Sequence, residues 1–177
     1  KLEWRGPYLG TPILGPVNAR EIIAELNRTK IVGIASGRAE FGPRALGNRS
    51  LLADPRDSNI KDAINDIKRR QKFRPFAPAI LEEYATEYFD GPMNEYMQFV
   101  AKAKHDYSSV THVDGTARVQ VVKKECGSAI RQILEEWYES TGCPMLLNTS
   151  LNIKGKPMVN TKEDAEEFSR LYNVAVF

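Results

Sequence analysis

The order of apolar patterns along the chain limits its fold more than any other feature. Short aliphatic runs, such as residues 30–36 and 144–148, alternate with amphipathic stretches such as residues 17–30 and 126–142. The short runs predict strands and the amphipathic stretches predict helices, but their order is not a strict βαβα succession. We therefore predict a mixed α/β (α+β) sheet with helices on its faces.

Local signals place several element boundaries. Asn18 followed by Glu21, and Thr161 followed by Asp164, are typical helix N-termini, and Gly142 is a typical stop. Asp57 or Ser58 is predicted to cap a helix that carries three isoleucines on one face. We also predict a strand and then a helix within residues 76–90, and strands within residues 96–104, 116–124 and 172–177.

The 177 residues suit one domain. Residues 1–16, rich in Gly and Pro, predict a linker or an extended lead-in segment, and residues 17–177 are predicted to form the domain. Two cysteines without metal-ligand spacing indicate a reducing compartment, so we expect a cytoplasmic protein and assign no metal to them. No signal peptide or bilayer-length apolar run occurs, so no membrane partner is expected.

Arginines stand among turn-forming residues in the stretch FGPRALGNRSLLADPR, residues 41–56. Guanidinium groups held by a Gly- and Pro-rich loop at a strand end suit phosphate or carboxylate binding, which applies here to Arg44 and Arg49. The alternative is that the arginines, Arg56 included, pair with Asp54, Asp57 or helix ends. Spacing leaves both interpretations open.

A second basic cluster runs from Lys68 to Arg74 in IKRRQKFRPFAP, residues 67–78. A solvated helix end explains Arg69 and Lys72. It explains Arg74 less well, because the segment that follows is too apolar to lie open to water. We therefore expect Arg74 to face an anion.

Two further segments are polar at predicted strand ends. In residues 112–122 a turn leads to Arg118 and Gln120, predicted on one face of a strand, where a plain exposed face is the alternative. In residues 144–157 a buried strand leads to small amide and hydroxyl side chains, Asn148 to Asn152. These predict either an anion-binding nest with free backbone N–H groups or an ordinary Asx or Ser/Thr turn.

The chain has no P-loop, no GxGxxG after a strand, no HExxH and no Ser/His/Asp order, so phosphate binding without a P-loop is the chemistry indicated. A net charge of +2 is too small to predict nucleic-acid binding. We therefore do not expect nucleic acid to be a partner.

These four segments, in this order, resemble the C-terminal domain of the NodU/CmcH-type O-carbamoyltransferases from about residue 30 to the end. The resemblance implies a YrdC-like twisted open sheet that binds ATP and carbamoyl phosphate as substrates and forms carbamoyl-adenylate. Family members are larger, and the resemblance implies an ASKHA-like N-terminal transferase domain in the same full-length chain. That domain would pass the carbamoyl group to a hydroxyl acceptor.

The resemblance also assigns residues. The Lys-x-Arg signature of YrdC-like sites matches Lys68 and Arg70, and Ser-x-Asn matches Ser150 and Asn152. Catalysis is expected from Lys68 and Arg74. Substrate or nucleotide binding is expected from Arg44, Arg70, Arg118, Asn148, Ser150 and Asn152. Gln71 stands where family members often have Glu, which removes any ion pair of that residue.

Mg²⁺ is expected to be held mainly by nucleotide oxygens, with Asp54 or Asp114 as minor helpers. Two other hypotheses remain open from the sequence: a basic YrdC-like module that binds structured RNA without catalysis, and a structural remnant whose arginines only brace loops.

Overall fold

The computed structural model describes residues 8, 10–13, 15, 17–40, 42, 44–71, 74–152 and 155–177. Their centre is a five-stranded sheet in the order β2-β4-β10-β5-β9. Its neighbouring strands are antiparallel except for the parallel pair β5–β9. The strands are β2 (Ile31–Ala35), β4 (Arg49–Ala53), β10 (Met145–Ser150), β5 (Ala77–Leu81) and β9 (Gln120–Val122).

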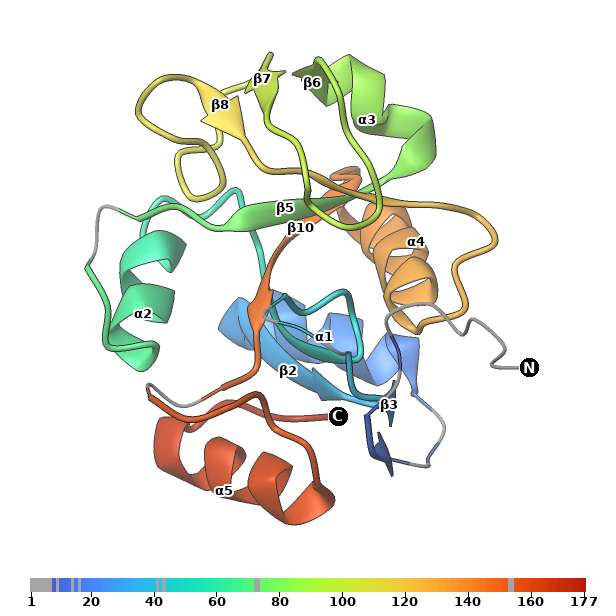
Figure 1. The fold of residues 1–177 in the computed structure, drawn as a ribbon, viewed down its shortest axis with the longest axis vertical. Helices are drawn as coiled ribbons and strands as arrows, with labels where there is room; N and C mark the ends of the chain where they lie inside the picture. Colours follow the sequence, from blue (N-terminus) through green and yellow to red (C-terminus); the bar gives the residue numbers. More distant parts are fainter. Residues whose placement is uncertain are drawn as a thin grey trace.

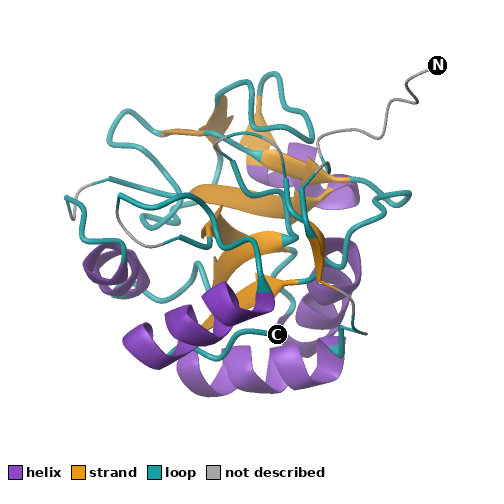
Figure 2. Cartoon of the chain, turned by 60° about the horizontal axis from the view of Figure 1, so that its bottom comes forward, coloured by secondary structure: helices purple, strands orange, loops and turns teal. Residues whose placement is uncertain are grey.

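Helices cover both faces of this sheet, as Figures 1 and 2 show. On one face, α1 (Ala19–Thr29) and α4 (Ile130–Thr141) pack in a core that includes Leu26 and Trp137. On the other, α2 (Ile60–Ile67) and α5 (Lys162–Tyr172) pack in a second core. Since Leu51 and Leu52 of β4 belong to different cores, alternation along the strand sends side chains to both layers.

Short elements flank the main sheet. β1 (Pro12–Ile13) pairs with β3 (Gly37–Arg38), and β6 (Phe89–Asp90), β7 (Ala101–Ala103) and β8 (Thr116–Ala117) form a small antiparallel sheet. The helix α3 (Glu82–Tyr88) lies beside this small sheet at the upper end of the molecule in Figure 1. Residues 1–7, 9, 14 and 16 of the predicted lead-in segment lie outside the described residues, but β1 shows that residues 12 and 13 pair with the domain.

The predicted helix caps are largely confirmed. Asn18 caps α1, a capping box at Thr161 and Asp164 opens α5, and Gly142 ends α4 in the left-handed conformation. The prediction for α2 was wrong by one or two residues, because Asn59 is the N-cap. Asp57 instead accepts a hydrogen bond from the Asn59 backbone N–H at 2.9 Å.

Three strand predictions need correction. The arginine-rich stretch is not one loop, since Arg49–Ala53 form the fully buried strand β4. The predicted strand 116–124 is interrupted at residues 118–119, which separate β8 from β9. The predicted final strand is reduced to a bridge between Val176 and Gly33, because α5 continues to Tyr172.

No helix in the described part of the chain is long and apolar enough to cross a membrane. Cys143 is buried and Cys126 partly buried, and both are free thiols.

Candidate functional site

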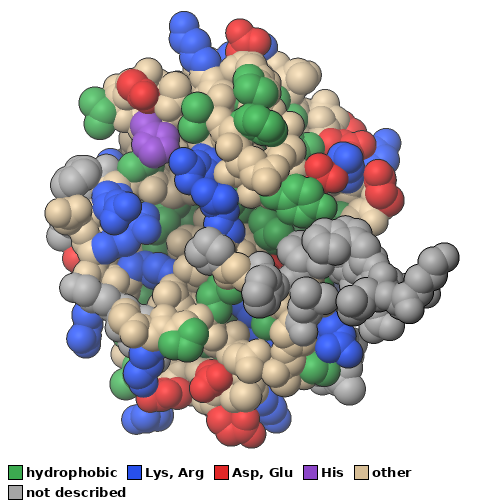
Figure 3. Space-filling view, viewed as in Figure 1, with side chains coloured by type: hydrophobic (Ala, Val, Ile, Leu, Met, Phe, Trp, Pro, Cys, Tyr) green, Lys and Arg blue, Asp and Glu red, His purple; other side chains and the backbone are tan. Residues whose placement is uncertain are grey.

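A cavity of about 690 Å³ opens where β10 ends and β5 begins. These two strand ends are adjacent because Asn148 pairs with Ala77 in the antiparallel register. Figure 3 shows Lys and Arg side chains gathered around a hollow in the left half of the face seen there. The cavity is lined by Arg44, Ala45, Arg70, Arg74, Pro75, Phe76, Ala77, Met97, His112, Val113, Asp114, Arg118, Asn148, Thr149 and Ser150.

Three arginine side chains of the lining have no partner in the part of the chain that the structure describes. Arg44, Arg74 and Arg118 come from three separate segments and are exposed. Among the described residues, none of the three guanidinium groups makes a hydrogen bond or an ion pair. Such a group offers a full set of donors in a planar fork that suits phosphate or carboxylate.

The fourth arginine, Arg70, is held in place. Its Nε donates to Asn65 Oδ1 at 2.7 Å, and its Nη2 donates to the Pro75 carbonyl at 3.2 Å. Its guanidinium lies 4.1 Å from the centre of the Phe76 ring. Burial, together with the positive charge of Arg74, lowers the pKa of Arg70. Arg70 nevertheless stays charged, because an arginine pKa lies far above neutrality.

Lys68 does not line the cavity but bonds Ser150, which does. It is buried, and its Nζ donates to Ser150 O at 2.5 Å, to Ser150 Oγ at 3.0 Å and to Asn152 Oδ1. Burial, with a smaller contribution from the Arg70 charge, lowers the pKa of Lys68 to about 7. The residue predicted to be catalytic therefore bonds protein oxygens here and ties the end of α2 to the end of β10.

Residues 148–150 form the end of β10 and not the turn predicted for residues 148–152. Asn148, Thr149 and Ser150 belong to β10 and pair with β4. Beyond the strand, the Leu151 N–H donates to Arg49 O and the Asn152 N–H donates to Ser150 O. Sequence reasoning ended the strand too early because small polar residues are typical of turns. Ser150 faces the cavity, whereas Asn152 reaches the site only through Ser150 and Lys68.

The turn at His112 is confirmed, but the predicted shared face of Arg118 and Gln120 is wrong. Gly115 N–H donates to His112 O, and Asp114 Oδ1 accepts from the backbone N–H and hydroxyl of Thr116. Arg118 lies in the break between β8 and β9 and is exposed, while Gln120 is buried. The break in the strand lets Arg118 line the cavity.

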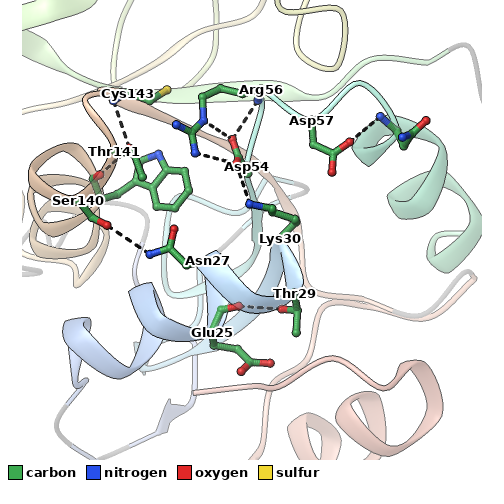
Figure 4. A network of polar contacts seen from close by, with 12 residues as sticks. Glu25, Asn27, Thr29, Lys30, Asp54, Arg56, Asp57, Ser140, Thr141 and Cys143 are labelled. Atoms are coloured by element: carbon green, nitrogen blue, oxygen red, sulfur yellow. Dashed lines mark hydrogen bonds and ion pairs between the residues drawn. The ribbon is translucent and has the colours of Figure 1, made fainter.

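The other two arginines of residues 41–56 make their contacts within the protein. Arg49 is fully buried and donates to main-chain carbonyls, among them Ser36 O at 2.6 Å and Thr11 O at 2.9 Å. Arg56 binds Asp54 through two bonds of 2.8 and 2.9 Å, as Figure 4 shows. Arg56 thus pairs with Asp54, as one alternative predicted. Arg44, which lines the cavity without such a pair among the described residues, fits the other alternative, an arginine that faces an anion.

Sequence reasoning missed two residues that hold the site. Asn65 of α2 orients Arg70, and the buried Glu40 accepts hydrogen bonds from the backbone N–H groups of Leu46 (2.8 Å) and Asn48 (2.7 Å). Glu40 thereby fixes the loop that carries Arg44. The one available signal was that Glu40 is an isolated acidic residue at the start of that loop.

Of the two carboxylates considered for Mg²⁺, only Asp114 lines the cavity. Asp54 is buried and engaged by Arg56 and, at 3.7 Å, by Lys30. Within the described ranges no group of three or more His, Cys, Asp or Glu residues is placed to hold a metal ion. The donor set fits a cation held mainly by ligand oxygens, with Asp114 as the protein's contribution.

Residues 23–176 match the family described as Carbamoyltransferase C-terminus. The chain belongs to this family. Over 144 residues it is 46% identical to nodulation protein NolNO of Sinorhizobium fredii, and this match covers 76% of the chain and 21% of that relative. Nodulation protein NolO of Bradyrhizobium diazoefficiens is 44% identical, with 76% and 26% covered. Nodulation protein U of Sinorhizobium fredii is 38% identical, with 90% and 29% covered.

The chain thus spans less than a third of the length of these relatives. Two solved structures share its fold. Full-length HypF in a phosphate- and nucleotide-bound form superposes with a TM-score of 0.61 at 16% identity, covering 92% of the chain and 20% of HypF. HypF of T. kodakarensis superposes with a TM-score of 0.57 at 18% identity, covering 89% and 20%. The predicted YrdC-like mixed α/β fold is confirmed.

Proposed function

We propose that this chain is the part of an O-carbamoyltransferase that binds ATP and carbamoyl phosphate and forms carbamoyl-adenylate. The observation that carries the proposal is the cavity with four arginines, three of them without a partner among the described residues, and one lining carboxylate. Two substrates that both carry phosphate need several fixed cations in one place. Family membership supports carbamoyl transfer as the chemistry.

The reaction needs two displacements. Water first cleaves carbamoyl phosphate to phosphate and carbamate. A carbamate oxygen then attacks the α-phosphorus of ATP, the bond to the bridging oxygen breaks, and pyrophosphate leaves with the negative charge. Arg44, Arg74 and Arg118 would hold the phosphate oxygens and stabilise the departing pyrophosphate as fixed charges. They are poor proton carriers because arginine stays protonated.

The remaining residues have supporting roles in this proposal. Lys68 fixes Ser150 at the cavity floor, and Phe76 and Met97 give the cavity an apolar side. Mg²⁺ would neutralise charge on the nucleotide phosphates, with Asp114 as its protein ligand. The nucleotide and phosphate bound in the HypF structure, which shares the fold, support the same choice of ligands.

The acceptor half of the reaction belongs to another part of the protein in this proposal. Because the relatives are several times longer than this chain, we propose that an ASKHA-like N-terminal domain transfers the carbamoyl group to a hydroxyl acceptor. This chain would then make the activated intermediate and hand it over.

The test is carbamoyl-phosphate-dependent exchange of labelled pyrophosphate into ATP. We expect Arg74→Ala to lower the exchange rate at subsaturating substrate about 10- to 150-fold, the effect of losing a charged hydrogen bond of about 1.5–3 kcal/mol. Arg20→Ala removes the same charge from an exposed position on α1 and should leave exchange unchanged. Unaltered exchange in Arg74→Ala would contradict the assignment of Arg74.

The RNA-binding hypothesis remains the second candidate, because exposed arginines without partners also suit a phosphate backbone. A gel-shift assay with structured RNA at physiological salt separates the two. Tight binding that weakens steeply with salt favours the module, whereas ligand binding that requires carbamoyl phosphate favours the enzyme.

A further inference from the structure

The loop that carries Arg44 is anchored to the sheet by its backbone. Ala45 and Leu46, the residues after Arg44, are buried at 2% and 5% exposure, so their peptide groups need partners inside the protein. Neither carbonyl is bonded through a helix or a strand. Both accept hydrogen bonds from amide side chains of distant strands.

Gln120, at the start of β9, supplies the first of these bonds. Its Nε2 donates to Leu46 O at 3.0 Å, across 74 positions of sequence. Gln120 is 3% exposed and does not line the cavity. It therefore acts on the site through the residues that it bonds, the loop and Asn148.

The second bond depends on Gln120 as well. Asn148 Nδ2 donates to Ala45 O at 3.2 Å and to Gln120 Oε1 at 2.7 Å. The two amides thus form a chain in which Gln120 orients Asn148 and both hold the loop. Glu40 accepts hydrogen bonds from two N–H groups of the loop, those of Leu46 and Asn48.

Gly47 limits any alternative position of the loop. Its φ is +125°, and a Cβ placed there would lie 2.7 Å from Ile130 Cβ of α4. The loop is therefore in direct contact with a helix on one side while the amides hold it on the other. Arg44, immediately before this anchored segment, is the one exposed side chain of residues 44–48.

We propose that Gln120 is a positioning residue for Arg44. It fixes residues 45 and 46 against the sheet, so that the Arg44 guanidinium is presented to the cavity without rearrangement when an anion binds. The inference rests on the proposed function for the identity of the anion, and on the hydrogen bonds alone for the anchoring.

The first measurement is backbone hydrogen exchange of Leu46 and Asn48, whose N–H groups donate to Glu40. We expect Gln120→Met, which keeps the side-chain length but removes both amide contacts, to speed their exchange about tenfold or more. Gln132→Met makes the same chemical change on an exposed side chain of α4 and should leave these two amides unchanged. Should Gln120→Met fail to fold, Gln120→Asn keeps the amide and shortens its reach.

The second measurement is calorimetric binding of carbamoyl phosphate and ATP to the chain. We expect Arg44→Ala and Gln120→Met each to weaken binding about tenfold. The double variant should bind no more weakly than Arg44→Ala alone, because Gln120 acts through Arg44. A merely structural role would make the two losses multiply.

The outcomes separate the two proposals. Unchanged exchange at Leu46 and Asn48 in Gln120→Met overturns the anchoring, and multiplied losses in the double variant overturn the link to Arg44. If the unaltered chain binds neither ligand, the proposed function fails, while the exchange experiment still decides whether Gln120 holds the loop.

Discussion

Two arginine-containing regions of this molecule differ in what faces the guanidinium groups. In the cluster of Lys30, Asp54 and Arg56, a buried carboxylate is bonded by the arginine and approached by the lysine. Figure 4 shows that these contacts are all within the protein. In the cavity, Arg44, Arg74 and Arg118 meet no such partner among the residues described.

The difference shows that the role of an arginine depends on the acceptors that folding brings to it. Arg44 and Arg56 lie in the same stretch of sequence, yet one faces a cavity and the other a carboxylate. Burial alone would raise the pKa of Asp54, but the hydrogen bonds from Arg56 hold it below its ordinary value. The buried carboxylate of the cluster is therefore paired within the protein, whereas the guanidinium groups of Arg44, Arg74 and Arg118 have no ion-pair partner among the described residues.

The largest effect on stability is expected for Arg49→Met. The change leaves Ser36 O, which Arg49 now satisfies, without a donor inside the protein, and leaves Thr11 O with the Ala39 N–H alone. We expect a loss of about 3–4 kcal/mol in the free energy of unfolding, measured with urea. A loss below about 1 kcal/mol would mean that water replaces these bonds.

The next effect is a dependence of stability on pH through Lys68. The pKa of Lys68 is about 7 in the folded protein, whereas the unfolded chain has the ordinary value of 10.5. Between pH 7 and pH 10.5 the unfolded chain therefore binds one more proton than the folded protein. The free energy of unfolding therefore rises with pH above 7, and this contribution is lost as pH falls through 7. Relative to Lys68→Met, we expect a gain of about 2 kcal/mol between pH 7 and 9. Parallel urea-stability curves of the two proteins would contradict the shifted pKa.

A smaller effect is expected for Arg56→Ala. Asp54 would keep Lys30 at 3.7 Å but lose two direct hydrogen bonds. Because the Arg56 side chain is itself 37% exposed, solvent limits the loss, which we expect to be about 1 kcal/mol. Binding of ATP and carbamoyl phosphate should not change, and a weakened affinity would remove the distinction between the two regions.

Arg118→Ala should give the reverse pattern and the smallest change in stability. The exposed side chain has no partner in the described structure, so the free energy of unfolding should stay within about 0.5 kcal/mol. Affinity for the phosphate-bearing ligands should fall about tenfold or more in calorimetry. If the variant lost stability but kept its affinity for the ligands, Arg118 would support the fold and would not bind the ligands.

The sequence predicted correctly the features that depend on neighbouring residues. The caps at Asn18 and Thr161 and the stop at Gly142 were correct because such signals act within one turn of helix. The strand β4 was missed because Arg49 and Ser50 resemble loop residues. Its burial depends on carbonyls at Thr11 and Asn160, which lie far away in the sequence.

At the candidate site, too, local signals could be predicted from the sequence and long-range contacts could not. Arg44, Arg74 and Arg118 stood out because each arginine followed a turn or preceded an apolar run, and the structure places all three at one cavity. The support that Gln120 gives could not be predicted, because no spacing rule relates an amide to a carbonyl 74 positions away.

The pairing of residues 175–177 with β2 has a consequence for how copies of this protein meet. β2 is the outer strand of the main sheet, and Gly33 and Ala35 donate to Ala175 O and Phe177 O. An uncovered outer strand is a template on which other chains can add a strand and aggregate. The tail occupies that template, and the absence of a side chain at Gly33 lets Val176 approach closely enough to do so. On this side the sheet is therefore protected from growing across molecules.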